Sequence, residues 1–307
     1  MPGYGRNDII LPMNTLTTFF RDYVKDVTRL SRSSTLITED NVYQEAAADI
    51  RPYLDKMAEA LVLPGSGVEG LSNVDDLYEK AMAGKSCLLL TEHYSNMDLS
   101  LVTYLLAQAG GRGKEISDSI IAIAGMKLNE ENPVVSAFAS AYSRIVICPS
   151  RSLQSLDAEK DRAEIVRAHG INRAAMKAVI RQKYKGHLIL IFPSGTRYRP
   201  GDPSTKRGVR EIDSYIRSFD YMCPVAINGQ VLHIRPGDMM DDEVSHDLVR
   251  ISFGPVIPCG EFRDRARAQA EERGISGSDE KKQAVADAIM EELERMHLEG
   301  ELKRQAL

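Results

Sequence analysis

The stretch Thr91–Asp98, which reads Thr-Glu-His-Tyr-Ser-Asn-Met-Asp, decides the fold class because it joins a strand pattern to a helix pattern. The run before it, Cys87–Leu90, is short, apolar and preceded by Gly84, which is typical of a buried strand. Apolar residues at helical spacing follow over 99–109, and Asn96 is the candidate N-cap of that helix. A buried strand that passes through a short connection into a helix indicates an α/β sheet.

Two polar residues of this stretch are candidates for chemistry. His93 falls in the connection and Asp98 in the first helical turn, so their side chains can meet across the turn. A carboxylate that fixes the tautomer of an imidazole and stabilises its charged form provides what a histidine general base needs. At the carboxyl end of a parallel strand, this pair would face the ligand crevice of the sheet. A histidine and an aspartate at this spacing are also common by chance, so the hypothesis needs a second motif.

The second motif spans residues 191–200, Ile-Phe-Pro-Ser-Gly-Thr-Arg-Tyr-Arg-Pro, directly after the strongest strand pattern in the chain. Its proline and glycine predict a sharp turn, from which Arg197 and Arg199 emerge. The planar fork of arginine suits paired hydrogen bonds to a phosphate. If both motifs lie at carboxyl ends of parallel strands, a base and a phosphate clamp share one crevice, which favours a phosphorylated alcohol as substrate. The alternative is that both arginines are surface residues paired with Asp202 or other acids.

Strand and helix patterns alternate from residue 86 onward, which predicts an α/β fold with a mostly parallel mixed sheet flanked by helices. The helix pattern at 155–185 is long and contains Gly170 as a candidate interruption. The further patterns are strands at 119–124, 144–148, 187–192, 223–227 and 248–253, and helices at 134–142, 213–219 and 281–305.

Residues 1–84 show helix patterns, whereas strand and helix patterns alternate in the rest of the chain. Helical spacing of apolar residues covers 14–30, 40–62 and 74–83, with Pro52 as a candidate kink. We therefore predict two domains, a small helical bundle at 1–84 and an α/β domain at 85–307.

Composition restricts the class of protein. The chain has 307 residues and a formal net charge of −5, which does not indicate a nucleic-acid partner. Its four cysteines are widely spaced beside apolar runs, so we expect reduced core thiols in a cytoplasmic protein and no metal site. The first twenty residues lack a signal-peptide pattern, and no apolar run approaches the ~20 residues that span a bilayer. Peripheral contact with the inner face of a membrane stays open.

Together the two motifs resemble those of the glycerolipid acyltransferase superfamily, in which His-x4-Asp precedes a Phe-Pro-Glu-Gly-Thr-Arg-like motif. Ser194 departs from the lysophosphatidate acyltransferase form, which has glutamate there. Pro-Ser-Gly-x-Arg-x-Arg-Pro over 193–200 is similar to the soluble, plastid-type glycerol-3-phosphate acyltransferases, as are Asp202–Thr205 and a strand that begins at Arg144 and precedes Ser150-Arg151. The family has further basic residues after that strand, and only Arg151 matches them here.

The resemblance implies an enzyme that moves a fatty acyl group from an acyl thioester to the 1-hydroxyl of glycerol 3-phosphate, giving lysophosphatidate for phospholipid synthesis. The co-substrate is a thioester of acyl carrier protein or of coenzyme A, and no cofactor is expected. It further implies direct transfer and not an acyl-enzyme on Ser95 or Cys148. The implied roles are a catalytic base and its partner, His93 and Asp98; phosphate binding by Arg197, Arg199 and Arg151; and an acyl and oxyanion region at Ser194, Gly195 and Thr196.

Other readings remain open at this point. The acceptor is alternatively lysophosphatidate or another lipid, or the chain is a catalytically silent lipid- or carrier-binding protein of the same fold. The basic residues of 160–185 suit an acidic carrier protein or anionic lipid head groups, or form a solvated helical face interspersed with Asp161 and Glu164. The remaining histidines are predicted to be structural or surface residues: His169, His187, His233, His246 and His297.

Overall fold

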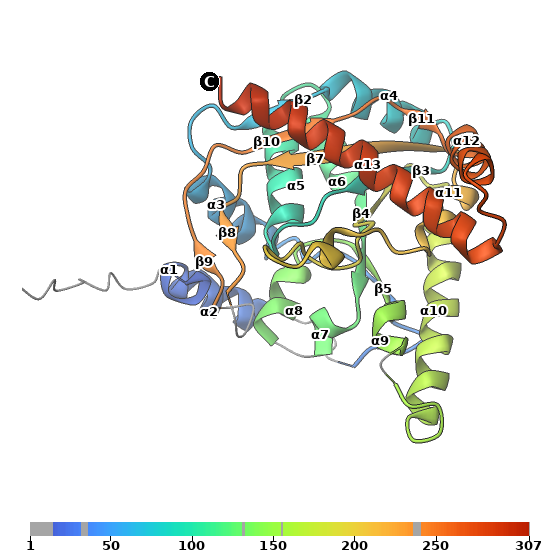
Figure 1. Cartoon of the computed structure of the whole chain (residues 1–307). Helices are drawn as coiled ribbons and strands as arrows, with labels where there is room; N and C mark the ends of the chain where they lie inside the picture. The colour runs from blue at the N-terminus through green and yellow to red at the C-terminus, as the bar shows by residue number, and fades with distance from the viewer. Residues whose placement is uncertain (1–14, 32–35, 131–132, 155, 236–240, 307) are drawn as a thin grey trace, which may run out of the picture.

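A large mixed sheet forms the centre of this computed structural model, which describes residues 15–31, 36–130, 133–154, 156–235 and 241–306 (Figure 1). Within these ranges the sheet has nine strands. Along the sheet they are β1 (Tyr43–Gln44), β5 (Arg144–Ile147), β4 (Ile120–Gly125), β6 (Leu188–Ile191), β3 (Cys87–Thr91), β7 (Tyr221–Asn228), β10 (Arg250–Phe253) and β2 (Gly67–Glu69), with β11 (Ile257–Pro258) paired to β7. A separate hairpin consists of β8 (Leu232–His233) and β9 (Glu243–Val244).

The five central strands, β5, β4, β6, β3 and β7, are mutually parallel. Antiparallel pairs occur where β1 meets β5 and where β10 and β11 meet β7, so the predicted mostly parallel mixed sheet is confirmed. All five residues of β3 are buried, as expected for a strand covered on both faces. Alternate residues of β3 point to opposite sides: Leu89 joins one apolar core, and Leu88 and Leu90 join the other.

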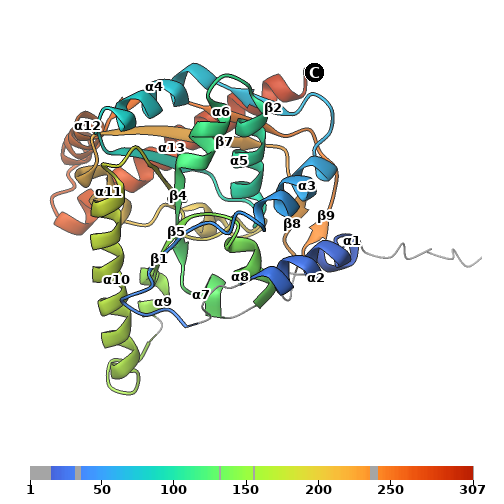
Figure 2. The same ribbon diagram turned by 180° about the vertical axis from the view of Figure 1, so that it is seen from behind.

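Helices cover both faces of the sheet, as Figures 1 and 2 show from opposite sides. The core on the Leu89 side includes residues of α1 (Leu16–Phe19), α2 (Arg21–Leu30), α3 (Arg51–Leu61), α4 (Leu71–Met82), α5 (Asp98–Gln108), α6 (Gly113–Ser119) and α8 (Pro133–Ala139). The core on the other side includes residues of α10 (Arg162–Gln182), α11 (Ile212–Ser218), α12 (Cys259–Glu272) and α13 (Ser278–Arg304). Three short helical segments lie in connections: α7 (Lys127–Glu130), α9 (Ser150–Gln154) and the 3-10 helix η1 (Pro203–Lys206).

The N-terminal region is not purely helical, contrary to the sequence interpretation. Strands β1 and β2 extend the main sheet at its two ends, and the helices of this region share the Leu89 core. The predicted helix at 40–62 was wrong in its first half, because α3 begins only at Arg51. Pro52 lies in the first turn of that helix, where its missing N–H costs nothing, so it starts the helix and does not kink it. The boundary between residues 84 and 85 stays a prediction, and the N-terminal residues 1–14 lie outside the described ranges.

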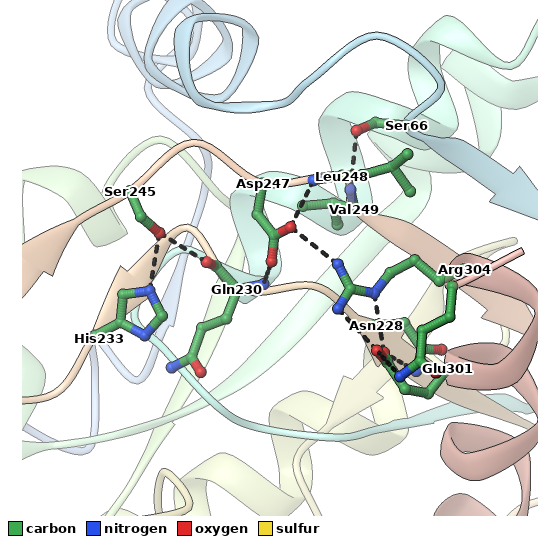
Figure 3. Close-up of polar contacts among 11 residues, drawn as sticks. Ser66, Asn228, Gln230, His233, Ser245, Asp247, Leu248, Val249, Glu301 and Arg304 are labelled. Atoms are coloured by element: carbon green, nitrogen blue, oxygen red, sulfur yellow. Dashed lines mark hydrogen bonds and ion pairs between the residues drawn. The ribbon is translucent and has the colours of Figure 1, made fainter. Parts of the chain in front are cut away.

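Two long helices follow the predictions with two corrections. Helix α10 begins only at Arg162, later than predicted, and it passes Gly170 without interruption. Because Gly170 has no side chain, the end of the Glu39 side chain can lie close to it, where a Cβ would be 2.2 Å from Oε1. Helix α13 lies across β7 and is held near its C-terminal end by polar contacts (Figure 3). In Figure 3 Arg304 donates to Asp247 at 2.9 Å. In addition, the Asn228 amide donates to the His297 carbonyl at 2.8 Å.

All four cysteines are buried, which confirms their reading as core thiols. Burial, reinforced by Asp220, raises the pKa of Cys87 to about 12, and burial likewise raises the pKa of Cys223 and Cys259. Thiols with raised pKa values are poor nucleophiles. In the part of the chain that the structure describes, no helix is both long enough and apolar enough to cross a bilayer.

Candidate active site

The two sequence motifs meet because their strands are neighbours. Strands β3 and β6 are parallel and in register, with Leu90 opposite Ile191, so their following loops leave the same edge of the sheet. The Tyr198 N–H donates to the His93 carbonyl at 2.8 Å, which joins the two loops directly. The His93 ring also stacks on Phe192, with centroids 4.0 Å apart and ring planes 18° apart. The predicted proximity of the two motifs is therefore observed.

The hydrogen bonds of the loop that follows β3 converge on Asp98. It is the first residue of α5, is 2% exposed, and accepts four hydrogen bonds. Its Oδ2 accepts from His93 Nδ1 at 2.9 Å, from the Tyr94 N–H at 2.6 Å and from the Ser95 N–H at 2.9 Å, and its Oδ1 accepts from Ser95 Oγ at 2.8 Å. The N-cap of α5 is Met97 and not Asn96, because the carboxylate of Asp98 and the hydroxyl of Ser95 close this turn instead.

The contact with Asp98 determines what the His93 ring can do. A carboxylate that already receives two backbone N–H donors acts as an acceptor, so the proton of the neutral imidazole lies on Nδ1. Nε2 then carries a lone pair, and no described residue donates a hydrogen bond to it. The side chain is 18% exposed, and the aspartate can stabilise the imidazolium that forms when Nε2 takes a proton. Ser95 Oγ donates to Asp98 Oδ1 at 2.8 Å and accepts from the Met97 N–H at 3.1 Å, so it is part of the turn that holds Asp98.

The β6 loop begins with a tight turn. Gly195 adopts a φ of +64°, a conformation that favours glycine, and its N–H donates to the Phe192 carbonyl at 2.9 Å. Ser194 is buried, and its hydroxyl donates to the Thr196 carbonyl at 2.7 Å. The Gly195 amide is therefore engaged within the turn, and its predicted role as an oxyanion donor would require that bond to open.

The arginines that follow differ in their surroundings. Arg197 is half-buried and bonds Asp242 Oδ2 at 2.5 Å, and the Asp242 side chain is 1% exposed. The alternative of an arginine paired with an acid is thus observed at Arg197, although the partner is Asp242 and not Asp202. Arg199 is exposed, and only its backbone is bonded to described residues, through Thr205 and Asp202. Asp202 accepts from Ser204 instead, which leaves the Arg199 guanidinium available for a ligand.

Arg151 lies further away along the same edge. It is an exposed residue of α9, which follows β5, and β4 separates β5 from β6. At about 5 Å per strand, β5 and β6 are about 10 Å apart. The structure therefore brings together the histidine, the aspartate and the Pro193–Arg199 loop, and it places Arg151 at the side of this group.

A buried cluster that the sequence reading missed supports the His93 loop. Glu92 is 4% exposed and accepts from the Ile227 N–H at 2.8 Å, from Tyr94 Oη at 2.7 Å and from His297 Nδ1 at 3.0 Å. Burial and the Glu92 carboxylate raise the pKa of Tyr94, so its hydroxyl stays a donor. His297 belongs to α13, so the C-terminal helix bonds the residue directly before the candidate base. No local spacing could have revealed a pair 205 residues apart.

This cluster predicts a pH-dependent contribution to stability. Burial lowers the pKa of His297, but the hydrogen bond and charge of Glu92 outweigh it, and Glu294 adds to Glu92 while Lys206 opposes it, so the pKa is raised above 6.5. The stabilisation from the charged ring is complete below the unfolded pKa and is lost as the pH rises through the folded pKa. We expect His297→Asn, which keeps a donor near Nδ1 but no charge, to lower Tm more at pH 5.5 than at pH 9.

Thermal unfolding of both proteins across this pH range measures the difference. The matched control is His246→Asn, which changes an exposed histidine that packs edge-on against Phe19. A Tm difference between wild type and His297→Asn that is constant with pH would contradict the charged contact.

Comparison with known proteins identifies the class. The profile of the acyltransferase family matches residues 68–228, more than half of the chain and including both motifs, and the chain therefore belongs to this family. No curated protein matches the sequence. Among solved structures, the chain is similar to the 1-acyl-sn-glycerophosphate (LPA) acyltransferase PlsC from Thermotoga maritima, with 16% identity, a TM-score of 0.41, and coverage of 91% of this chain and 89% of that chain.

Proposed function

We propose that this acyltransferase moves a fatty acyl group from an acyl thioester to the 1-hydroxyl of glycerol 3-phosphate. The observation that carries the proposal is the direct contact between the His93–Asp98 pair and a loop that presents Arg199, whose guanidinium has no partner among the described residues. A base and a cation on one pair of neighbouring loops suit an acceptor that carries a hydroxyl and a phosphate. Glycerol 3-phosphate is such an acceptor.

The proposed chemistry is a single displacement through a tetrahedral intermediate. As the acceptor oxygen bonds to the thioester carbonyl carbon, Nε2 of His93 takes the hydroxyl proton and Asp98 stabilises the resulting imidazolium. When the intermediate collapses, the carbon–sulfur bond breaks and the imidazolium returns the proton to the departing sulfur. No residue becomes acylated, in agreement with the hydroxyl of Ser95 being held by Asp98.

The phosphate would be held by the arginines on the same edge of the sheet. Arg199 is exposed and unpaired among the described residues, whereas Arg197 is fixed by Asp242 and has its remaining N–H groups for a ligand. Arg151 would complete the site from α9. Holding the phosphate in this way places the hydroxyl beside His93, so that the reaction does not depend on random collision.

The deciding experiment offers the purified protein two labelled acceptors, glycerol 3-phosphate and lysophosphatidate, each with acyl coenzyme A and with acyl carrier protein thioester. We expect label from glycerol 3-phosphate to enter lysophosphatidate with at least one donor. Transfer to lysophosphatidate alone would assign a different acceptor and refute the proposal. Absence of transfer with every pair would favour a binding protein of the same fold. The donor that supports turnover identifies the thioester class.

Arg199→Ala is expected to raise the KM for glycerol 3-phosphate roughly 10- to 150-fold, because a hydrogen bond to a charged group contributes about 1.5–3 kcal/mol. The KM for the thioester should change much less. Arg199→Lys should restore little, since lysine keeps the charge but loses the planar fork. Arg199 is a cleaner test than Arg197, whose loss also leaves the buried carboxylate of Asp242 without its partner.

Steady-state kinetics with each substrate varied in turn measures both constants. Arg217→Ala is the matched control, because this exposed arginine lies in the last turn of α11 at the opposite edge of the sheet, shortly before β7 begins. If Arg199→Ala behaves like Arg217→Ala, the loop does not bind the acceptor phosphate.

A further inference from the structure

Helix α10 and the turn that follows it, residues 183–186, expose cations and large apolar side chains together. Among the apolar ones, Val166 is 63% exposed, Met176 38%, Ile180 51% and Tyr184 53%. Glu164, the acid of the segment 162–185, is half-buried and bonds Arg167 at 3.0 Å. Asp161 and Glu164 are both partly exposed at the N-terminal end of α10, which agrees with a solvated face there, whereas residues 165–185 contain no acid. The exposed cations beside the apolar residues are Arg162, Arg173, Lys177, Arg181 and Lys185.

The apolar residues form one stripe. Met176 and Ile180 are four residues apart near the C-terminal end of α10, Val166 lies on the same side near its N-terminal end, and Tyr184 follows in the turn after the helix ends at Gln182. At 1.5 Å per residue, Val166 and Ile180 are about 21 Å apart along the helix. Arg173 and Lys177 lie within the same arc of the helix, so each apolar side chain has a cation beside it. Several large apolar side chains exposed on one side of a helix indicate an interaction site.

The charge of this segment opposes that of the rest of the chain. Residues 162–185 contain seven basic residues and one acid, a formal charge of +6, whereas the whole chain has −5. One of the seven, Lys183, is buried against the Ser218 carbonyl, and the others lie on or near the surface. A positive surface on a negatively charged protein is complementary to an anionic partner.

The position of α10 relates this surface to the candidate active site. The helix follows β5 and α9, so its N-terminal end lies at the edge of the sheet from which the β3 and β6 loops emerge. In Figures 1 and 2 this end projects beyond α9 as the most distant part of the domain on that side. A partner that lies along α10 would therefore also come near the edge of the sheet that carries His93.

We propose that α10 is the membrane-contacting element of this protein and lies on an anionic phospholipid surface. The stripe of Val166, Met176, Ile180 and Tyr184 enters the boundary between head groups and acyl chains, and the flanking arginines and lysines bind lipid phosphates. A flat lipid surface fits a long straight stripe on a projecting helix. An acidic carrier protein would require mainly the cations, and it would leave much of the apolar stripe in water. The proposal does not depend on which acceptor the enzyme uses.

Sedimentation of the full chain with vesicles tests the proposal without any measurement of turnover. We expect binding to vesicles of phosphatidylcholine mixed with phosphatidylglycerol, weaker binding to phosphatidylcholine alone, and a loss of binding as salt is added. Combined Arg173→Glu, Lys177→Glu and Arg181→Glu should weaken partition to the mixed vesicles about 100-fold or more, since each lost cation costs about fivefold. Combined Val166→Ser, Ile180→Ser and Tyr184→Ser should also weaken it, while the remaining binding stays salt-sensitive.

Two control variants match these changes on other elements. Lys56→Glu, Lys85→Glu and Lys114→Glu give the same change in charge at exposed lysines, and Leu298→Ser with Leu302→Ser removes exposed apolar residues of α13. Both controls should bind the mixed vesicles almost as wild type does. Equal loss in the lysine control would overturn the proposal, because binding would then depend on the net charge of the protein and not on α10. The proposal would be overturned if the wild-type protein did not bind the mixed vesicles but bound acyl carrier protein through α10.

Discussion

Replacement of His93 by alanine is expected to lower turnover about 10²–10⁴-fold and to leave the fold intact. The magnitude is that of general-base assistance by a positioned side chain. The fold should survive because His93 lies in a loop, where its ring contacts Asp98 and Phe192 and supports no core strand. Binding of the two substrates should change much less than turnover, because the proton moves only in the transition state.

Steady-state turnover, with thermal unfolding as the check on the fold, measures this prediction. His246→Ala, at an exposed histidine of the same protein, should retain wild-type turnover. Near-normal turnover in His93→Ala would remove His93 from the chemistry, and with it the basis of the proposed mechanism.

Asp98→Asn is expected to reduce turnover about 100-fold or more, although the two side chains have nearly the same shape. The amide carries no charge to stabilise the imidazolium of His93. It also has one oxygen where the carboxylate has two. If that oxygen accepts from the Tyr94 and Ser95 N–H groups, as Oδ2 does now, the NH₂ group faces Ser95 Oγ. The negative charge that keeps the proton on Nδ1 of the neutral ring is then gone.

Ser95→Ala separates the charge of Asp98 from the packing of the loop. This variant removes the hydrogen bond to Oδ1 but keeps the carboxylate and its three contacts at Oδ2. It should therefore retain most of the turnover that Asp98→Asn loses. Equal losses in the two variants would mean that Asp98 acts through loop structure and not through its charge on His93.

Local sequence patterns predict the part of the site that is built from short separations. Five residues separate His93 from Asp98, and a strand followed by a tight turn and a helix brings them to 2.9 Å. The proximity of the second loop follows from a general rule, since parallel strands end at one edge of the sheet. Local sequence patterns do not reveal the order of strands in the sheet, so the direct pairing of β3 with β6 is known only from the structure.

The missed features depend on partners that are distant in sequence or on elements too short to show a pattern. Asp242 follows Arg197 by 45 residues, and His297 follows Glu92 by 205, so each pair forms only in the folded chain. Strands β1 and β2 have two and three residues, which is below the length at which alternation is visible. Backbone pairing with β5 and β10, and not residue type, makes these segments strands.

The hydrogen bond between Glu92 and His297 can form only late in the synthesis of the protein. Both motifs have left the ribosome long before residue 297 is made, yet the carboxylate next to the candidate base has no imidazole partner until α13 is complete. Contacts between such distant residues form late, because the intervening chain must first be ordered. The nascent protein therefore carries its two motifs for most of its synthesis without the contact between Glu92 and α13.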